Sequence, residues 1–325
     1  MLGAYTRVAV TGGCGFIGHH LVGALLSLGK AVAVLDNLSS GSNVAPGIRL
    51  VRGDLRDPAR VQEALQDAEL VFHVAANANG TVSVNDPRFD FESNVVGTFN
   101  VLEAAREMGV RRLVQVSSFS VYGVPQRFPI DEEHPTEPCV PYGGDKLAGE
   151  VLAKTFFRTY GLPVVIGRPV AVYGPGENPE LALVEISRYL RWHLNGRPIR
   201  IVGDVDRKTR DFVHVSDLVQ GLLVLAEGGQ FGESYNIGSG GEVSMRQLVE
   251  TIGAVTGSEA AIDAVTEITE DTYRLVADIT KIRALGYEPK VSLHEGVAQL
   301  AEELGRRPAL PRGTTIFKPE QQGEG

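Results

Sequence analysis

The stretch Thr11–Gly18, TGGCGFIG, follows the apolar run Val8–Val10 and precedes an apolar helical pattern over His19–Leu28. Glycines at positions 12, 15 and 18 allow a tight turn and let the backbone come close to a bound group. A pyrophosphate at this place would lie at the positive end of the following helix. The order of strand, glycine loop and helix therefore predicts a dinucleotide-binding fold.

A second apolar strand ends at Asp36, about 20 residues beyond the loop, where a carboxylate can accept a hydrogen bond from a ribose hydroxyl. The same carboxylate would repel a 2′-phosphate, and residues 37–40 contain no Arg or Lys. These features favour NAD over NADP. Asp54 has two interpretations: it could face the adenine, or it could be the N-cap of a helix that begins near Pro58.

Apolar, β-branched runs alternate with helical patterns through the first half of the chain. We expect strands at Arg7–Val10, Ala31–Leu35, Ile48–Val51, Leu70–Val74, Leu113–Val116 and Val164–Ile166. Continuously apolar strands separated by helices predict a parallel sheet that is covered on both faces. The predicted fold class is α/β, a Rossmann-like doubly wound parallel sheet with a smaller C-terminal substrate-binding region.

The pattern loosens after about residue 170 into connections rich in Gly and Pro. Here we expect helices at Leu181–Leu194, Ser216–Leu225, Ser244–Val255 and Ser292–Leu304, and strands at Ile199–Val202 and Ser234–Ile237. We therefore predict an NAD-binding domain over residues 1–169, to which some later segments return. A substrate-binding region over 170–311 and a tail over 312–325 complete the predicted organisation.

Tyr142 and Lys146 lie four residues apart at the start of a helix that we expect to run to about Tyr160. Residues with this spacing share one face of a helix. The Lys charge can then favour the Tyr phenolate and lower its pKa, which would make Tyr142 a general base or acid. The alternative is a half-buried Tyr beside a solvated Lys.

The composition is that of a globular protein, with 325 residues, 43% hydrophobic and 22% charged. A formal charge of −9 disfavours nucleic acid and anionic membranes as partners. No apolar run has the length of a membrane span, and the first ten residues lack the regions of a signal peptide, so we expect a cytoplasmic protein. Cys14 and Cys139 have no metal-ligand spacing, so we predict free thiols and no metal site.

Further motifs follow in a characteristic order. Together with the glycine loop and the Tyr142–Lys146 stretch, they resemble those of the extended short-chain dehydrogenase/reductase family. Within this family the chain is most similar to the NAD-dependent nucleotide-sugar epimerases of the UDP-glucose 4-epimerase type. The resemblance covers roughly residues 6–304. The segments that carry it are His73–Ala76, Asn94–Ala104, Ser117–Gly123, Arg168–Pro169, Val172–Gly176 and Arg210–His214.

The resemblance implies that Ser118, Tyr142 and Lys146 form the catalytic group. Tyr142 would take the proton of a sugar hydroxyl, Lys146 would hold the nicotinamide ribose, and Ser118 would bind the reacting oxygen. Asn94 would support this group. The expected contacts of NAD are Gly12, Gly15, Phe16, Ile17, Gly18, Asp36, Asn37, Asp54, Leu55, Ala75, Asn94, Tyr142 and Lys146, and those of the substrate are Ser118, Ser120, Tyr142 and Arg210.

Within the family, dehydratases carry an Asp-Glu pair after the catalytic Ser, and the related decarboxylases carry a Glu. Phe119 and Ser120 occupy these positions here, which disfavours loss of water or carbon dioxide. The resemblance then implies C4 epimerisation through a transient 4-keto sugar, of the UDP-glucose/UDP-galactose or UDP-glucuronate type. The alternatives are an NAD(P)H-dependent 4-keto-sugar reductase and, less favoured because Tyr142 and Lys146 are intact, a non-catalytic dinucleotide sensor.

On the substrate side, the resemblance implies that Arg210 grips a nucleotide diphosphate, and its alternative is a surface salt bridge. Two positions depart from the family: Ala171 replaces a common Asn, and no Arg stands near Ile268, although Arg274 could substitute. The resemblance also implies a homodimer formed by the apolar faces of Phe91–Met108 and Val151–Tyr160. Ordinary core packing of these two segments is the alternative.

Overall fold

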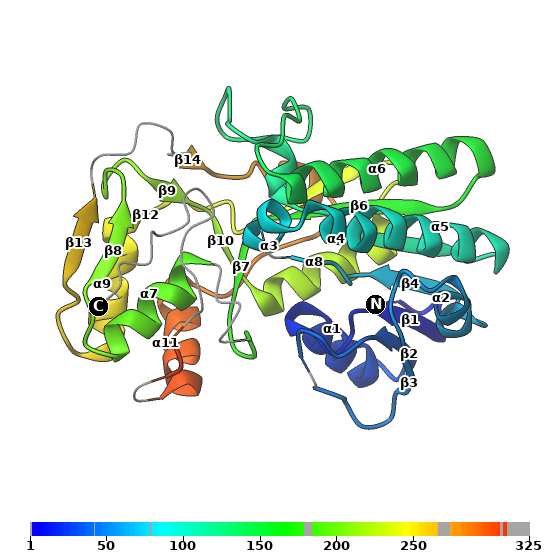
Figure 1. Ribbon diagram of the computed structural model, residues 1–325, viewed down its shortest axis with the longest axis horizontal. Helices are drawn as coiled ribbons and strands as arrows, with labels where there is room; N and C mark the ends of the chain where they lie inside the picture. The colour runs from blue at the N-terminus through cyan, green and yellow to red at the C-terminus, as the bar shows by residue number, and fades with distance from the viewer. Residues whose placement is uncertain are drawn as a thin grey trace.

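The computed structural model describes residues 2–41, 43–78, 80–178, 184–265, 274–305 and 308–310. Its centre is a seven-stranded parallel sheet in the order β3-β2-β1-β4-β5-β6-β11 (Figure 1). The strands are β1 (Arg7–Thr11), β2 (Ala31–Asp36), β3 (Arg49–Arg52), β4 (Leu70–His73), β5 (Arg112–Val116), β6 (Val164–Pro169) and β11 (Ser234–Ile237). The predicted Rossmann-like fold is confirmed.

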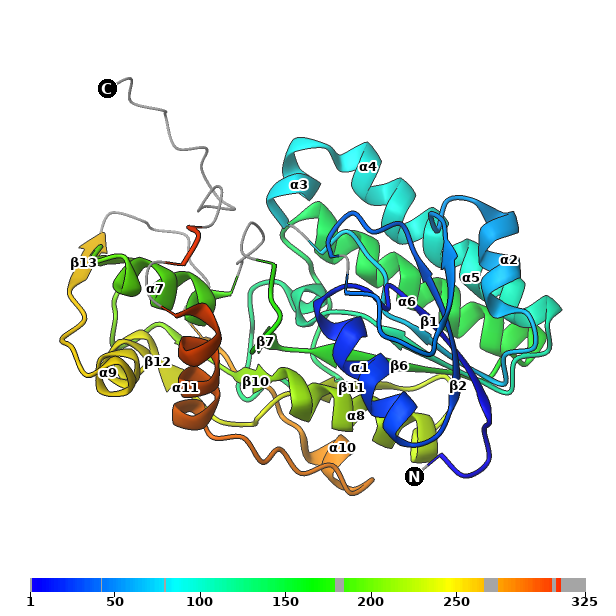
Figure 2. The ribbon, with the colours of Figure 1, turned by 90° about the horizontal axis from the view of Figure 1, so that it is seen from below.

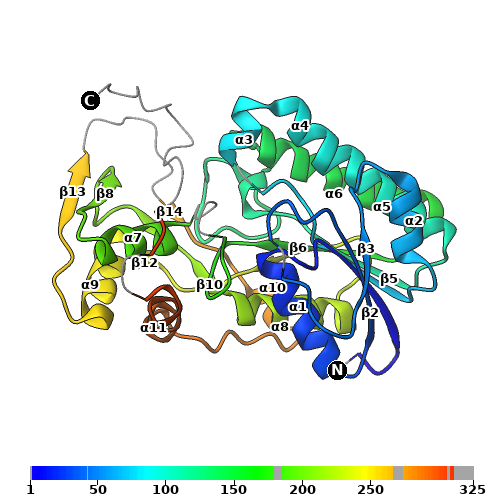
Figure 3. The same cartoon turned by 60° about the horizontal axis from the view of Figure 1, so that its bottom comes forward.

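Helices cover both faces of this sheet, as Figure 3 shows. On one face, α1 (Phe16–Ser27) packs against α8 (Val215–Gly228), and their apolar side chains join one core cluster with β1 and β2. On the other face, α2 (Pro58–Leu65), α5 (Gly97–Glu107) and α6 (Pro141–Tyr160) form a second cluster. Every residue of β4, β5 and β6 is buried, which explains why these strands are mostly apolar and do not alternate apolar with exposed polar residues.

The segment Phe91–Met108 is not one regular helix. It begins at the last residue of α4 (Pro87–Phe91), continues through a π-helical turn η1 (Glu92–Val96) and ends with α5. A short helix α3 (Gly80–Asn85) precedes α4. A π-helical turn inside a helix is often found at functional sites, because it redirects the side chains that follow. Here the turn carries Asn94, and α4 and η1 both pack on α6.

The second region consists of short sheets and three amphipathic helices. Strand β7 (Ala171–Tyr173) pairs with β10 (Phe212–His214), β9 (Thr209–Arg210) lies between β12 (Val243–Ser244) and β14 (Arg274–Leu275), and β8 (Ile199–Val202) pairs with β13 (Ile262–Val265). The helices α7 (Glu185–Leu194), α9 (Met245–Thr256) and α11 (Leu293–Leu304) enclose a third apolar cluster. This region lies beside the large sheet in Figure 2.

Later segments return to the large sheet. Strand β11 extends it beyond β6, and α8 covers it, while the short helix α10 (Thr280–Arg283) packs near β11. The predicted boundaries at residues 169 and 311 stay predictions. The predicted helix over 181–194 begins at Glu185, residues 179–183 and the predicted tail lie outside the described residues, and no helix of the described part is long and apolar enough to cross a membrane.

Candidate active site

The glycine loop joins β1 to α1 at the carboxyl edge of the sheet. Gly12 has φ +71°, and a Cβ on it would lie 2.7 Å from the Ala75 Cα, while a Cβ on Gly18 would overlap the Gly12 carbonyl oxygen. A Cβ on Gly15 would meet only the Gly12 oxygen at 3.5 Å, so this glycine leaves open space before the helix. Gly15 is also the N-cap, and no side chain caps α1. These features fit a pyrophosphate on the helix N-terminus.

Asp36 ends β2 beside this loop. Its Oδ2 accepts a hydrogen bond from the Cys14 N–H at 2.9 Å, and its Oδ1 accepts one from the Leu38 N–H at 2.7 Å. Each oxygen keeps a second lone pair with which it can accept a ribose hydroxyl. Asp36 therefore fixes the loop as well as fitting the ribose role. The Cys14 thiol is buried, and burial raises its pKa to about 11, which fits an unreactive thiol.

Asp54 is held by two neighbours on the same edge. Its oxygens accept hydrogen bonds from the Arg56 guanidinium at 2.9 and 3.0 Å and from the Asn37 amide at 3.0 Å. The Arg56 hydrogen bond is the main cause that lowers its pKa to about 2. The N-cap interpretation of Asp54 is wrong, because Asp57 caps α2 by accepting from the Ala59 and Arg60 N–H groups. Contacts of NAD with Phe16, Ile17, Leu55 and Ala75 stay predictions.

Ser118 and Tyr142 meet although 24 positions separate them. Ser118 ends the segment after β5 and caps the turn η2 (Phe119–Tyr122), while Tyr142 lies in the first turn of α6. The Ser120 hydroxyl donates to Ser118 Oγ at 2.8 Å, and the Ser118 hydroxyl is hydrogen-bonded to Tyr142. The hydroxyl groups of Ser120, Ser118 and Tyr142 are therefore hydrogen-bonded in series. Phe119 is buried against Tyr122 and presents no polar group here.

The expected lowering of the Tyr142 pKa by Lys146 is wrong for this structure. Burial raises the Tyr142 pKa to about 12, the Asp90 charge raises it further, and only the hydrogen bond from Ser118 opposes them. The Lys146 ammonium is itself buried, and desolvation lowers its pKa to about 8 although Glu150 and Asp90 act in the other direction. Both groups are thus perturbed toward their neutral forms, because Lys146 is buried and Tyr142 is half-buried.

His73 at the end of β4 is buried, and its ring bonds to two threonines. It contacts Thr11 Oγ1 through Nδ1 at 2.8 Å and Thr98 Oγ1 through Nε2 at 2.9 Å. Because Thr98 donates its own proton to the Asn94 carbonyl, its oxygen accepts from the His73 Nε2–H. Burial and the Lys146 charge lower the His73 pKa to about 3, so the ring is neutral.

Asn94 is fully engaged with protein groups. Its Oδ1 accepts from the Asn77 N–H at 2.8 Å, and its amide donates to Asp90 Oδ1 at 2.9 Å and to the Asn77 carbonyl at 3.1 Å. A supporting role therefore fits Asn94 better than a direct contact with a ligand. Asp90 was missed by the sequence reasoning, although it lies one helical turn before Asn94.

A second buried network ties α6 to the sheet, and the sequence reasoning also missed it. Arg168 on β6 forms a two-pronged ion pair with Glu150, with Nε–Oε1 at 2.9 Å and Nη2–Oε2 at 2.6 Å. Ser117 donates to the same carboxylate at 2.6 Å, and the Tyr122 hydroxyl contacts the guanidinium at 2.8 Å. Since Glu150 lies one turn after Lys146, this network fixes the helix that carries the catalytic group.

The arginines expected to hold the nucleotide diphosphate lie in the second region. Arg210 is buried on β9, where its Nε lies 3.3 Å from Glu185 Oε1 on α7 and an Nη donates to its own neighbour, the Thr209 carbonyl. The alternative of a surface salt bridge is therefore wrong, and the diphosphate role stays a prediction. Arg274, the possible substitute, binds Glu242 with two contacts of 2.7 Å. Residues 266–273 lie outside the described part.

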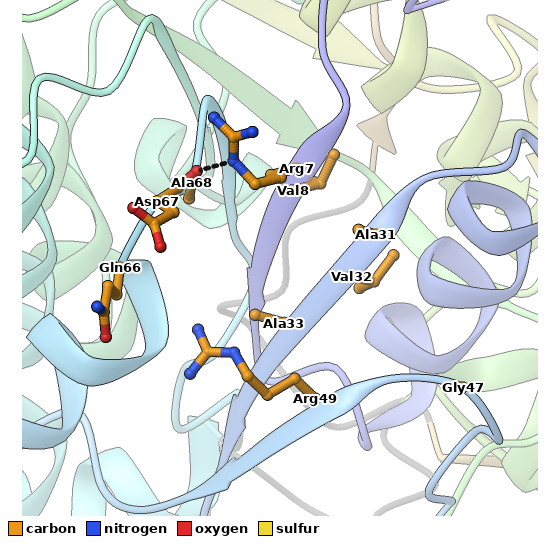
Figure 4. A pocket seen from close by; sticks show the side chains of 10 residues that line it. All are labelled: Arg7, Val8, Ala31, Val32, Ala33, Gly47, Arg49, Gln66, Asp67 and Ala68. Carbon is orange, nitrogen blue, oxygen red and sulfur yellow. Dashed lines mark hydrogen bonds between the residues drawn. The ribbon is translucent and has the colours of Figure 1, made fainter.

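A separate hollow of about 430 Å³ lies at the opposite, amino-terminal edge of the sheet (Figure 4). Arg7 and Arg49 point into it from β1 and β3. The Arg7 Nε donates to the Asp67 carbonyl, and the Arg49 guanidinium donates to the Glu63 and Ala64 carbonyls at the end of α2. Both cations stabilise a helix terminus and the turn after it, so this hollow carries no catalytic assignment.

Comparison with known proteins places the chain in a family. Residues 8–238 match the family described as the NAD dependent epimerase/dehydratase family, and the chain belongs to it. The UDP-glucose 4-epimerase of Mycolicibacterium smegmatis is 36% identical over 307 residues, which cover 91% of this chain and 97% of that protein.

Two solved structures have the same fold over most of their length. The UDP-glucose 4-epimerase of Thermotoga maritima, solved with UDP-glucose, has a TM-score of 0.86 and 33% identity over 92% of this chain and 98% of its own. The dTDP-glucose 4,6-dehydratase of Streptomyces venezuelae, solved with NAD and TYD, has a TM-score of 0.83 and 33% identity over 92% and 96%. The chain is thus an NAD-dependent enzyme of this family, and its predicted cofactor is confirmed.

Proposed function

We propose that this enzyme epimerises the sugar of a nucleotide diphosphate, at C4, through a transient 4-keto intermediate. The observation that carries the proposal is the chain of Ser120, Ser118 and Tyr142 hydroxyls, in which the two positions after Ser118 hold no carboxylate. A dehydratase would need an acid there to expel the C6 hydroxyl. Hydroxyl groups can bind a sugar oxygen and move its proton, and epimerisation needs no further acid beyond this and the hydride transfer with NAD.

In this proposal, bound NAD would supply the acceptor for the hydride of the sugar C4 and the donor that returns it to the opposite face of the 4-keto intermediate. Tyr142 takes the proton of the C4 hydroxyl and later gives it back, while Ser118 donates a hydrogen bond to the oxygen as it becomes a ketone. Because the Tyr142 pKa is about 12 here, its phenolate needs positive charge nearby. The oxidised nicotinamide ring would supply that charge when NAD is bound.

We propose that Arg210 binds the diphosphate by exchanging its contact with Glu185 for phosphate oxygens. The guanidinium is buried, so a doubly charged ligand would meet it in a poorly solvated place where charge-assisted hydrogen bonds are strong. Strand β9, which carries Arg210, pairs with β14, which carries Arg274. Replacing Arg210 should therefore weaken substrate binding more than it weakens NAD binding.

We further propose a homodimer. Large apolar side chains are exposed on and next to α3, α4, α5, α6 and η1, whose ribbons lie close together in Figure 1. They are Val84, Phe89, Phe91, Val96, Phe99, Met108, Val151 and Tyr160. A second copy that packs the same helices against them would bury this apolar surface.

The test is a panel of nucleotide sugars incubated with the purified protein without added cofactor, with C4 configuration read by proton NMR. Interconversion of a C4 pair supports the proposal, and the preferred pair names the substrate. Turnover only with stoichiometric NADPH would indicate the reductase, accumulation of a 4-keto-6-deoxy product would indicate a dehydratase, and binding without turnover would indicate a sensor.

Tyr142→Phe should abolish turnover while NAD remains bound, because only the phenolic oxygen is removed. Tyr160→Phe is the matched control, since this Tyr is exposed at the far end of the same helix. Wild-type turnover in Tyr142→Phe would refute the mechanism.

A further inference from the structure

Two carboxyl groups meet behind the catalytic pair, on neighbouring helices. Asp90 is fully buried on α4, and Asp145 lies on α6 directly before Lys146. Helix α4 packs on α6, as the views in Figures 1 and 2 agree. The two side chains hydrogen-bond to each other. The proposed mechanism assigns no role to either of them.

The hydrogen bonds around this pair indicate that one of the two carboxyl groups carries a proton. Asp90 Oδ1 accepts from the Asn77 amide at 2.7 Å and from the Asn94 amide at 2.9 Å. The Oδ2 atoms of Asp90 and Asp145 are buried and, within the described residues, accept from no N–H or O–H group. Two ionised carboxylates have no proton with which to bond to each other, so the contact requires that one of them is protonated.

The negative charge of the pair affects the pKa of both Tyr142 and Lys146. The Asp90 charge raises the pKa of Tyr142 and that of Lys146. Burial, followed by the hydrogen bond and the charge of Asp90, raises the Asp145 pKa to about 7. A proton on the pair therefore reduces the negative charge that opposes the Tyr142 phenolate.

Other ionisable groups on the surrounding elements are Lys146, Glu150, Lys154 and Arg158 on α6, Glu103, Arg106 and Glu107 on α5, and Arg168 on β6. Glu150 on α6 is bound by Arg168, and His73 on β4 is neutral. On α4 and η1, Arg88 pairs with Glu92, while Asp86 caps its helix by accepting from Phe89 N–H. Helix α3 carries no charged residue. Beside Tyr142, both Lys146, whose pKa burial lowers to about 8, and the carboxyl pair can therefore change charge near neutral pH.

We propose that Asp90 and Asp145 share one proton at neutral pH and act as positioning residues, which join α4 to α6 and give Lys146 a counterion with a single negative charge. Loss of the proton makes the pair doubly negative, which pushes α4 from α6 and raises the Tyr142 pKa. The catalytic consequence rests on the function proposed above, whereas the shared proton does not.

The shared proton is tested first, on the NAD-bound enzyme labelled with 13C at the Asp carboxyl carbon. Wild type should show a carboxyl resonance that titrates between about pH 6 and 8 and that is lost in both Asp145→Asn and Asp90→Asn. Asp131→Asn is the control, since Asp131 is an exposed partner of Arg127. The proposal is overturned if wild type shows no carboxyl resonance that titrates above about pH 5.5 and disappears in these two variants. This test does not require that a sugar substrate has been found.

The positioning role is tested by the pH profile of kcat. The Asp145→Asn amide can donate its N–H to Asp90 but cannot titrate, so the carboxyl pair should no longer contribute to a decline of kcat above neutral pH, and only the contribution of Lys146 should remain. The ratio of Asp145→Asn to wild-type kcat should rise between about pH 6 and 8.5, by up to about thirtyfold if the doubly negative enzyme is inactive. Parallel profiles for the two enzymes, with the titrating resonance present, would overturn the catalytic consequence and leave a structural pair.

Discussion

Glu150→Gln should destabilise the fold strongly, because it leaves the Arg168 cation buried without its partner. The two side chains are only 2% and 4% exposed and join through two short contacts. Breaking a buried ion pair by removing one member costs about 3–5 kcal/mol. With an unfolding entropy of about 2.1 cal/mol/K per residue, a loss of about 4 kcal/mol lowers the Tm of a 325-residue chain by about 6 °C.

The assay is urea unfolding together with thermal melting, at one protein and one NAD concentration, since bound ligand and association both shift apparent stability. Glu63→Gln is the control, because Glu63 forms an exposed pair with Arg60 that is worth at most about 1 kcal/mol. The double variant Glu150→Leu with Arg168→Met removes both charges and should be less destabilised than the sum of the single changes. A loss below about 1 kcal/mol for Glu150→Gln, or strict additivity, would refute the reasoning.

The same pair predicts a direction with pH. The Arg168 hydrogen bond and charge hold the pKa of Glu150 below its usual range, despite the opposing effect of burial. A carboxyl whose pKa is depressed on folding contributes stability above its unfolded pKa and loses that contribution as the pH falls through the folded value. Acid should therefore destabilise wild type more than it destabilises the double variant.

Three further predictions concern the loop, the buried histidine and the exposed helices. Gly18→Ala should reduce NAD affinity at least about tenfold in a fluorescence titration, because its Cβ would overlap the Gly12 carbonyl, whereas Gly23→Ala on the same helix meets nothing within 4 Å and should bind normally; equal affinities would contradict the loop geometry. The His73 ring should stay neutral from about pH 8 to 5 in an NMR titration, since burial lowers its pKa to about 3. The neutral ring contributes to the free energy of unfolding above the unfolded pKa, and this contribution is lost as the pH falls toward the folded pKa. A titration midpoint near 6.5 would refute its burial beside Lys146. Val151→Asp should convert the proposed dimer to monomer in sedimentation experiments while NAD binding is retained, because Val151 is 58% exposed on α6, and an unchanged mass would place any dimer contact elsewhere.

The substrate-side residues were the least predictable from sequence. Arg210 was expected at a diphosphate site or on the surface, and it lies buried against Glu185 on a helix 25 residues earlier in the chain. Spacing along the chain carries no information about such a partner, because β9 and α7 approach each other only after the second region has folded.

The sequence by itself determined the doubly wound sheet, the NAD loop, the role of Asp36 as the end of β2, and the helical placement of Tyr142 beside Lys146. These features follow from local rules: apolar runs form buried strands, glycines permit close turns, and residues four apart share a helical face. Such rules need only neighbours along the chain.

Only the tertiary structure decided the electrostatics of the site. It brought Ser118 to Tyr142, Asp90 to Asp145 and Arg168 to Glu150, and it raised the Tyr142 pKa where spacing to Lys146 had suggested a fall. The physical reason is that a pKa depends on burial and on charges from every direction, and most of those charges come from segments that are distant in sequence.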